Sequence, residues 1–275
     1  MATQDLHVRV LSELGRSIVV GHRAPGEVLR MEELGAEFGV SRSVMREVIR
    51  VLAAMNLVST RRSVGVTVQD SSRWNPFDRE IVRWRLAGPD RLLQLQSLGE
   101  LRAAIEPIAA QLAAERALPE QCGELTRAVI GMSVATKAGN LDEFLRWDLH
   151  FHRTLLLASG NMMFAGLSTI VAEVLLGRAE YHLMPEPPDR DAIDLHVQVA
   201  TAIRSGNGVA ARAAIEAILE DTSRGLQRAA LLEPEPARAA QPSGPQSDQL
   251  HRQITTRDRR LQTPTTPSIV MSHIS

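Results

Sequence analysis

Three ionisable residues stand where helical spacing predicts inward-facing, apolar positions. Asp148 and His152 are four residues apart, so on a helix their side chains lie on the same face. That face continues with leucines, and His196 falls on the apolar stripe of another expected helix. A buried carboxylate or imidazole is costly unless a partner satisfies it. An acid and two histidines from two helices are a suitable ligand set for a divalent metal with an open coordination position.

A simpler interpretation of the same residues stays open. Asp148 and His152 could hydrogen-bond each other across one helical turn, and His196 could be a core histidine with a local partner. Residue spacing alone does not choose between this arrangement and a metal site.

A second group of residues suggests binding to nucleic acid. Ser41 is a good N-cap, and the helix after it would turn Val44, Val48 and Leu52 towards a small core. Its outer side then carries the polar residues Arg42, Ser43, Arg46 and Arg50. Between Ser41 and Arg62 there are five arginines and one acid, which predicts a phosphate backbone as partner. The same pattern also occurs in small helical domains that bind no DNA.

Composition limits the kind of protein this is. The formal net charge is −1 over 275 residues, so any DNA binding is confined to a local patch. The single cysteine excludes an intramolecular disulfide and a cysteine-based zinc cluster, which fits a reducing cytoplasm. No apolar run is long enough to span a bilayer and the N-terminus lacks a signal pattern, so no membrane partner is expected.

The elements around the arginine-rich stretch predict a winged helix over residues 5–69. Leu6, Val10, Leu14 and Ile18 give one apolar stripe, and a second short helix covers 32–38. After the Ser41 helix, alternating residues from 57 to 68 predict two strands, with Val64 in the second, around a bend at 61–63. Helix, helix–turn–helix and hairpin together form a winged helix–turn–helix domain.

The rest of the chain predicts a linker, an all-helical domain and a tail. Residues 70–77 are polar and contain a proline, 78–231 carry helical periodicity, and 232–275 form a disordered tail of low aliphatic content. Helices are expected at about 141–158, 162–182, 190–205 and 208–230. A long helix before them is expected to turn Leu98, Leu101, Ile105, Ile108 and Leu112 inward. The predicted fold class is mainly α, with an N-terminal winged helix–turn–helix and a C-terminal helical bundle.

A family resemblance covers residues 6–68. It is carried by the stretches Pro25-Gly26, Phe38-Gly39-Val40-Ser41-Arg42, Arg46-Glu47-Val48 and Asn56-Leu57-Val58, which resemble the DNA-binding domain of the GntR family of bacterial regulators. The resemblance implies that Arg42 and Arg46 contact DNA and that a wing glycine, here Gly65, enters the minor groove. Arg62, Ser43 and Arg50 complete the predicted DNA-binding set. Arg30-Met31 and Ser63 depart from the family pattern, so an altered operator or wing contact is expected.

Residues 78–230 resemble the FCD effector domain of the FadR-type branch. The resemblance is carried by Glu100-Leu101-Arg102, Glu106-Pro107, Asp148 through His152, 158–161 and His196. It implies zinc or a related divalent metal held by an aspartate and three histidines, with a carboxylate effector bound there. Asp148, His152 and His196 match three of these ligands, but the fourth position is Ile218. Either the effector completes the coordination, or the pocket works without metal.

An acidic effector also needs cationic donors. Arg102 can clamp a carboxylate, although an i, i+4 salt bridge to Glu106 is the competing interpretation. Arg224 and Tyr181 are further candidates for effector contacts. The segment 73–78, Trp84 and Ile218 are similar to the galactonate-responsive repressor subgroup, which favours a sugar acid as effector.

The leading hypothesis is therefore a homodimeric, ligand-responsive repressor of a carbohydrate-acid catabolic operon, which binds a palindromic operator in double-stranded DNA. On this hypothesis the protein is not an enzyme. An alternative is a metal-dependent hydrolase that uses Asp148, His152 and His196 to cleave a sugar-acid lactone. A DNA-architectural protein without a ligand is a third possibility, and it leaves the inward acid and histidines unexplained.

Overall fold

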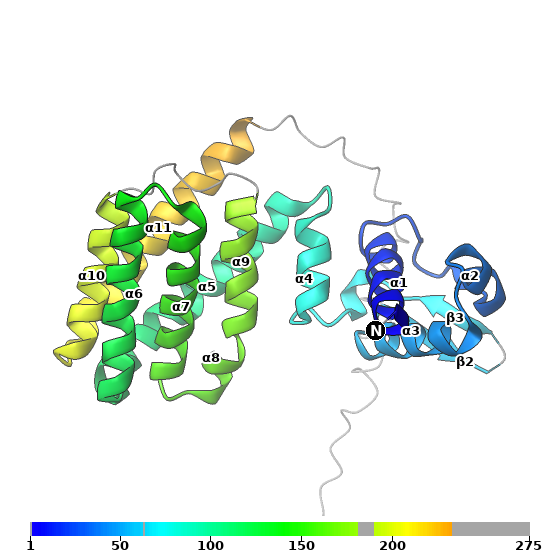
Figure 1. Cartoon of the computed structure of the whole chain (residues 1–275), viewed down its shortest axis with the longest axis horizontal. Helices are drawn as coiled ribbons and strands as arrows, with labels where there is room; N and C mark the ends of the chain where they lie inside the picture. Colours follow the sequence, from blue (N-terminus) through cyan, green and yellow to red (C-terminus); the bar gives the residue numbers. More distant parts are fainter. Residues whose placement is uncertain (1, 63, 181–189, 233–275) are drawn as a thin grey trace, which may run out of the picture. The chain divides into compact units, whose positions relative to one another are not determined.

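The structure is a computed structural model that describes residues 2–62, 64–180 and 190–232 (Figure 1). Within this part, eleven α-helices, a short 3-10 helix and three short β-strands form one compact unit that spans Met1–Pro234. The mainly α fold class is confirmed. Nearly all of the predicted tail and the predicted effector contact Tyr181 lie outside the described residues. None of the described helices is long and apolar enough to cross a membrane.

The N-terminal part contains three helices: α1 (Ala2–Val19), α2 (Met31–Glu37) and α3 (Arg42–Ala54). The chain passes directly from α2 to α3, and Gly39 adopts the left-handed conformation (φ 64°) that this turn requires. Ser41 caps α3, because its hydroxyl accepts the backbone N–H of Val44 at 3.4 Å. The predicted N-cap of the arginine-rich helix is confirmed.

A three-stranded antiparallel sheet completes the N-terminal part. Its strands are β1 (Val28–Leu29), β2 (Val58–Arg61) and β3 (Gly65–Val68), in the order β1-β3-β2. β2 and β3 form the predicted hairpin, in which Arg61 lies opposite Gly65. Helix–turn–helix plus hairpin is the winged-helix arrangement that the sequence predicts. β1 was not predicted, because two residues carry no periodic pattern.

Two details of the predicted N-terminal core are wrong. Met45 and Ile49 are buried beside Val48, whereas Val44 is only half-buried. The buried stripe of α3 is therefore wider than the predicted i, i+4 series, because this helix packs against α1, α2 and β2. Val64 is 48% exposed and lies before β3, not within it.

A 3-10 helix (Ser71–Arg73) and α4 (Arg79–Leu86) follow the sheet. α4 contributes to two apolar cores: Ile81 and Trp84 pack with the residues of the N-terminal core, and Val82 and Leu86 pack with residues of the helices that follow. α4 is thus shared by the core around α1 and the core around α5 and α9.

The remaining helices pack side by side as a bundle (Figure 1). They are α5 (Arg91–Arg116), α6 (Pro119–Lys137), α7 (Leu141–Ala158), α8 (Met162–Gly166), α9 (Ser168–Glu180), α10 (Arg190–Arg204) and α11 (Gly208–Leu232). α5 lies against α11 and α7, and α10 lies against α6 and α11. The main apolar core lies among α5, α6, α7, α10 and α11.

Two predictions for the bundle are wrong. The expected single helix at 162–182 is two helices, α8 and α9, that meet at Leu167. On α5 the predicted inward stripe is displaced, because Ile108 is 43% exposed whereas Arg102 and Glu106 are almost completely buried. Two charged residues occupy the face that the apolar pattern alone assigned to solvent.

Candidate functional site

The first candidate site begins on α7. This helix starts after Asn140, whose side-chain oxygen accepts the N–H of Glu143 at 3.0 Å. Phe151 buries one side of α7 in the main core, and Asp148 and His152 lie on the buried side as well, only 4% and 2% exposed. The helix is held by apolar packing, and that packing fixes where the acid and the histidine point.

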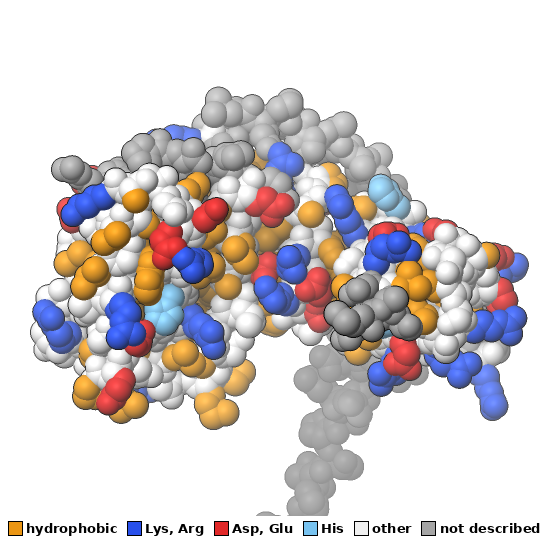
Figure 2. Space-filling model, viewed as in Figure 1, with side chains coloured by type: hydrophobic (Ala, Val, Ile, Leu, Met, Phe, Trp, Pro, Cys, Tyr) orange, Lys and Arg blue, Asp and Glu red, His pale blue; other side chains and the backbone are white. Residues whose placement is uncertain are grey.

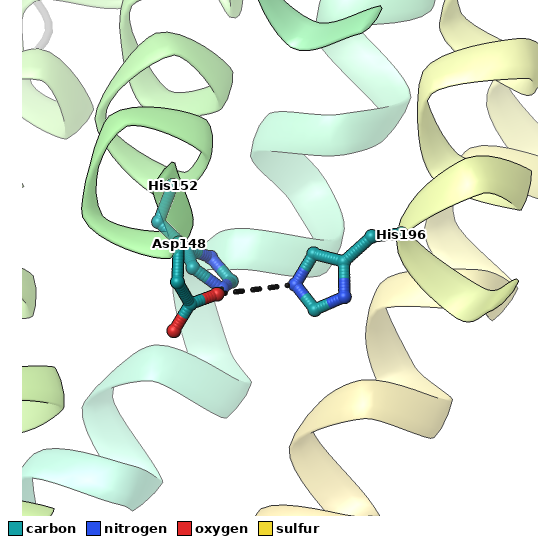
Figure 3. Close-up of side chains that lie close together, drawn as sticks. All are labelled: Asp148, His152 and His196. Carbon is teal, nitrogen blue, oxygen red and sulfur yellow. Dashed lines mark ion pairs between the residues drawn. The ribbon is translucent and has the colours of Figure 1, made fainter. Parts of the chain in front are cut away.

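His196 completes this cluster from α10, which faces α7 across the pocket (Figure 3). Oδ1 of Asp148 lies 3.3 Å from Nε2 of His196 and 3.5 Å from Nε2 of His152. One ligand atom from each of the three residues lies within 4.8 Å of the other two, and all three residues are buried. The structure therefore brings together the three residues that the sequence singled out.

The outer nitrogens of both imidazoles are already occupied. Nδ1 of His196 donates to the carbonyl of Ala192 at 2.6 Å, since a carbonyl can only accept. Nδ1 of His152 lies 2.9 Å from Oε2 of Glu106. These contacts direct each Nε2 towards Asp148, and Nε2 of His196 has no aligned hydrogen-bond partner. Such outer partners are typical of histidines that bind a metal through the opposite nitrogen.

Glu106 and Arg102 of α5 form a buried ion pair behind His152. Nε of Arg102 lies 2.6 Å from Oε1 of Glu106, and Nη2 lies 3.2 Å from Oε2. Nη2 also lies 3.4 and 3.3 Å from the two ring nitrogens of His152, so neither nitrogen alone takes this contact. Nη1 of Arg102 has no partner. The competing interpretation of Arg102 as a salt-bridge partner describes its contacts in this structure, and Arg102 also lines the cavity.

Burial and neighbouring charges set the protonation of these groups. Burial opposes ionisation of Glu106, but the charges of Arg102 and His152 outweigh it and lower the pKa of Glu106 to about 2. Burial likewise opposes ionisation of Asp148, but its contacts with His152 and His196 hold its pKa well below the usual range. Burial disfavours a charged His152, but Glu106 and Asp148 prevail and raise its pKa. The cluster thus favours two ionised carboxylates and shifts His152 towards its protonated form.

These side chains line a cavity of about 510 Å³. Its inner wall includes Arg102, Asp148, His152, His196 and Arg178, and its outer part is lined by exposed acids. Those acids are Asp191, Asp194, Glu220 and Asp221. A cavity of this size with convergent polar groups is typical of a small-molecule site.

The remaining predicted effector residues are placed as follows. Ile218 is 8% exposed and forms part of the cavity wall, so the fourth family ligand position is apolar. Arg224 lines the cavity, but its side chain is 61% exposed and lies 3.3 Å from Asp221. Tyr181 lies outside the described residues.

Sequence reasoning did not predict Arg178, which lines the cavity, or the second contact of Glu106, which lies behind His152. Arg178 was not singled out, although a cation in the apolar run of α9 is a signal, since Val174 and Leu175 are buried beside it. The sequence suggests Glu106 only as a partner of Arg102, but its contact with His152 also joins α5 to α7.

The second candidate site is the exposed face of α3 and the hairpin. Arg42, Ser43, Arg46 and Arg50 are exposed on α3, and Arg62 is exposed at the hairpin. Figure 2 shows blue side chains at the edge of the N-terminal part where the β2–β3 hairpin lies. Arg42 lies 3.7 Å from Glu32 and Arg50 lies 2.7 Å from Glu47, but these pairs are exposed and weak.

Gly65 begins β3 with φ 100°, a conformation that favours glycine. The arginine face and the glycine of the hairpin thus belong to adjoining elements of one winged helix. This is the arrangement that places a helix in the major groove and a wing beside it.

Comparison with known proteins identifies the family. Residues 6–68 match the model of the bacterial regulatory proteins of the gntR family, and residues 97–221 match the FCD domain. An uncharacterized HTH-type transcriptional regulator of Mycobacterium tuberculosis is 30% identical over 220 residues, which cover 78% of this chain and 87% of that protein. The chain belongs to the GntR family. It is a FadR-type member with an FCD domain, and hence a transcription regulator and not an enzyme.

Two further similarities describe this GntR regulator. The galactonate operon transcriptional repressor of Escherichia coli is 29% identical over 223 residues, which cover 80% of this chain and 96% of that one. A solved structure of Lar, described as controlling the Listeria monocytogenes agr system, aligns with a TM-score of 0.50 at 19% identity, over 81% of this chain and 96% of that one. The latter supports the fold alone. None of these relatives supports the lactone hydrolase alternative.

Proposed function

We propose that this GntR regulator is a homodimeric repressor of a carbohydrate-acid catabolic operon, released from its operator when a sugar acid or similar small carboxylate binds in the FCD domain. It acts in the cytoplasm on double-stranded DNA. The cavity that contains Asp148, His152, His196 and Arg102 is the observation that carries this proposal. The similarity to the galactonate operon transcriptional repressor supports a sugar acid as the effector class.

The buried charges at the inner end of the cavity favour an acidic ligand, whereas exposed acids line its outer part. Arg102 and Arg178 supply two buried cations, Glu106 and Asp148 supply two buried carboxylates, and the pKa of His152 is raised. The two cations and the two carboxylates balance, and the raised pKa of His152 shifts the buried groups towards a surplus of positive charge, which a monocarboxylate would neutralise. Because opposite charges attract strongly where water is excluded, this surplus selects an anion over a neutral sugar.

A divalent metal, zinc for example, is compatible with the same residues. Asp148, His152 and His196 would hold it, since both Nε2 atoms face Asp148 and that of His196 lacks a hydrogen-bond partner. A bound cation would supply a Lewis-acidic anchor for the carboxylate of the effector. Since Ile218 offers no donor, at least one coordination position would stay available to that ligand. Metal binding requires His152 to lose its proton, so it competes with protonation.

The DNA-binding part of the proposal assigns residues 5–69 to operator binding, 70–77 to the linker and 78–231 to effector binding and dimerisation. Arg42 and Arg46 would contact base edges, and Arg50, Ser43, Arg62 and Gly65 would contact the backbone or minor groove. A two-fold dimer would present two α3 helices to a palindromic operator.

Exposed apolar side chains in the helical part support dimerisation. Ile130 and Val134 stand four residues apart on α6, so they lie on the same face of that helix, and they are 59% and 61% exposed. Neighbouring exposed apolar side chains commonly mark a protein interface.

The DNA-binding assignment is tested by fluorescence anisotropy on the operator, first located by footprinting the promoter region of the chain's own operon. Arg42→Ala is expected to abolish specific binding, since a bidentate base contact is worth roughly 1–3 kcal/mol and a dimer loses two. Arg9→Ala is the matched control, because Arg9 is exposed on α1 and outside the predicted DNA-binding set. Equal operator affinity in the two variants would refute the assignment of α3.

A further inference from the structure

Arg178 of α9 is a buried cation without a partner in the described structure. Its side chain lines the effector cavity, and the residue is 8% exposed. Its Nε has no hydrogen-bond partner, and none of the described residues forms an ion pair with its guanidinium. Other buried charges of the bundle are paired: Glu173, on the same helix, lies 2.5 Å from Nε of Arg79 and 3.4 Å from Nε of Arg83.

An unpaired buried charge is costly, and the titration of Arg178 reflects this. Burial, reinforced by the positive charge of Arg102, lowers the pKa of Arg178 to about 10. The guanidinium remains charged at neutral pH. A residue that only filled space would be served better by leucine or methionine at lower cost.

Arg102 is the less available of the two cavity arginines. Its Nε and Nη2 are held by Glu106, and Nη2 also contacts His152, which leaves only Nη1 without a partner. The Nε of Arg178 has no hydrogen-bond partner, and Asp148 and Asp221 attract its guanidinium only through space, with neither carboxylate hydrogen-bonded to that Nε. A ligand carboxylate can therefore take two parallel hydrogen bonds from Arg178 without breaking an existing pair.

We propose that Arg178 is the principal side-chain anchor for the carboxylate of the effector, acting beside any metal held by Asp148, His152 and His196, and that Arg102 is chiefly a positioning residue that holds Glu106 and His152. This inference rests on the proposed function and deepens it. The acids at the mouth of the cavity, Asp194, Glu220 and Asp221 among them, accept hydroxyl hydrogens from the far end of the ligand. The ligand class is thus a polyhydroxy monocarboxylate that enters with its carboxylate first.

The test compares Arg178→Gln and Arg178→Lys with Arg153→Gln, which removes an exposed arginine of α7 that does not line the cavity. Galactonate, glycolate and the uncharged polyol galactitol are titrated by calorimetry into full-length protein at one metal concentration. The galactonate Kd of Arg178→Gln is expected to rise about tenfold or more, because a hydrogen-bonded charge is lost. Arg178→Lys is expected to lie in between, and galactitol is expected to bind all variants equally weakly.

A second readout separates an anchor from a merely structural role. Removing an unpaired buried charge is expected to leave the melting temperature of ligand-free Arg178→Gln equal to or above that of Arg153→Gln. A structural role predicts a clear fall. Equal galactonate affinity in Arg178→Gln and Arg153→Gln would overturn the inference while leaving the proposed function intact.

The outcomes also separate this inference from the proposed function. If wild type binds galactonate through Arg178 but stays on its operator, the anchor stands and the proposed derepression fails. If wild type binds neither galactonate nor glycolate, both proposals are overturned.

Discussion

Glu106→Gln is the perturbation whose size follows most directly from the structure. The carboxylate of Glu106 is fully buried, accepts two contacts from Arg102 at 2.6 and 3.2 Å, and lies 2.9 Å from Nδ1 of His152. Glutamine keeps the shape but removes the charge, so Arg102 loses the carboxylate that neutralises it. Removing one member of a buried ion pair typically costs about 3–5 kcal/mol.

That cost converts into a measurable shift in melting temperature. For a chain of this size 1 kcal/mol corresponds to about 2–4 °C, so Glu106→Gln is expected to lower the melting temperature by roughly 6–20 °C. Differential scanning calorimetry at neutral pH measures the shift. Glu100→Gln is the matched control, because Glu100 lies on the same helix but is exposed, and its change is expected to stay within about 0.5 kcal/mol.

A double variant tests whether the cost comes from the unpaired cation. Arg102→Met in the Glu106→Gln background removes the orphaned charge, so its further effect is expected to be smaller than that of Arg102→Met alone. A melting temperature of Glu106→Gln equal to that of Glu100→Gln would refute the argument that Glu106 stabilises the fold by neutralising the buried charge of Arg102.

Three further outcomes are expected. Because the pKa of Glu106 is lowered to about 2 in the folded protein, its carboxylate stabilises the fold fully above about pH 4.5. The difference in free energy of unfolding between wild type and Glu106→Gln is therefore expected to shrink as the pH falls from about 4.5 towards about 2. A difference that stays constant in urea titrations over this range would contradict the prediction. Glu173→Gln is expected to lower the free energy of unfolding by about 1–3 kcal/mol, because it removes the buried carboxylate that contacts Arg79 and Arg83. Glu180→Gln, which changes an exposed glutamate of the same helix, is the control, and equal urea midpoints in the two variants would contradict the prediction. Arg46→Ala is expected to weaken operator binding with little change in the slope of log K against log salt, because Arg46 is assigned to a base contact, which carries sequence preference. Loss of a phosphate contact would instead lower the magnitude of that slope by about one, and such a fall would reassign Arg46 to the DNA backbone.

The winged helix could be predicted because its signals are local. A serine N-cap, a glycine in the left-handed region and alternating valines each determine a short piece of structure, and their order specifies the domain. The same locality explains the i, i+4 pair Asp148 and His152 on one face of α7. Their proximity to His196 could be predicted because all three residues are polar residues within the apolar stripes of two helices. Polar residues at such positions indicate a buried site even when they are far apart in sequence.

What could not be predicted depends on contacts between helices. The buried face of α5 carries Arg102 and Glu106, and a hydrophobic stripe rule assigns charged residues to solvent. Only the neighbouring α7 supplies the histidine that pairs with Glu106. Arg178 was not predicted for a related reason. The cavity that it lines is formed by residues of five helices, α5, α7, α9, α10 and α11, and the sequence of α9 alone does not show which side of that helix faces the cavity.

Operator release by a sugar acid tests the central claim most directly. Wild type and the variants Asp148→Asn, His152→Ala and His196→Ala are bound to the operator and titrated with galactonate, gluconate and galactitol while anisotropy is followed. The account predicts release of wild type by at least one of the two acids and not by galactitol, with release lost or shifted at least about tenfold in each variant while operator affinity without ligand is retained. Release of all three variants at the wild-type concentration, or no release of wild type by either acid, would contradict it.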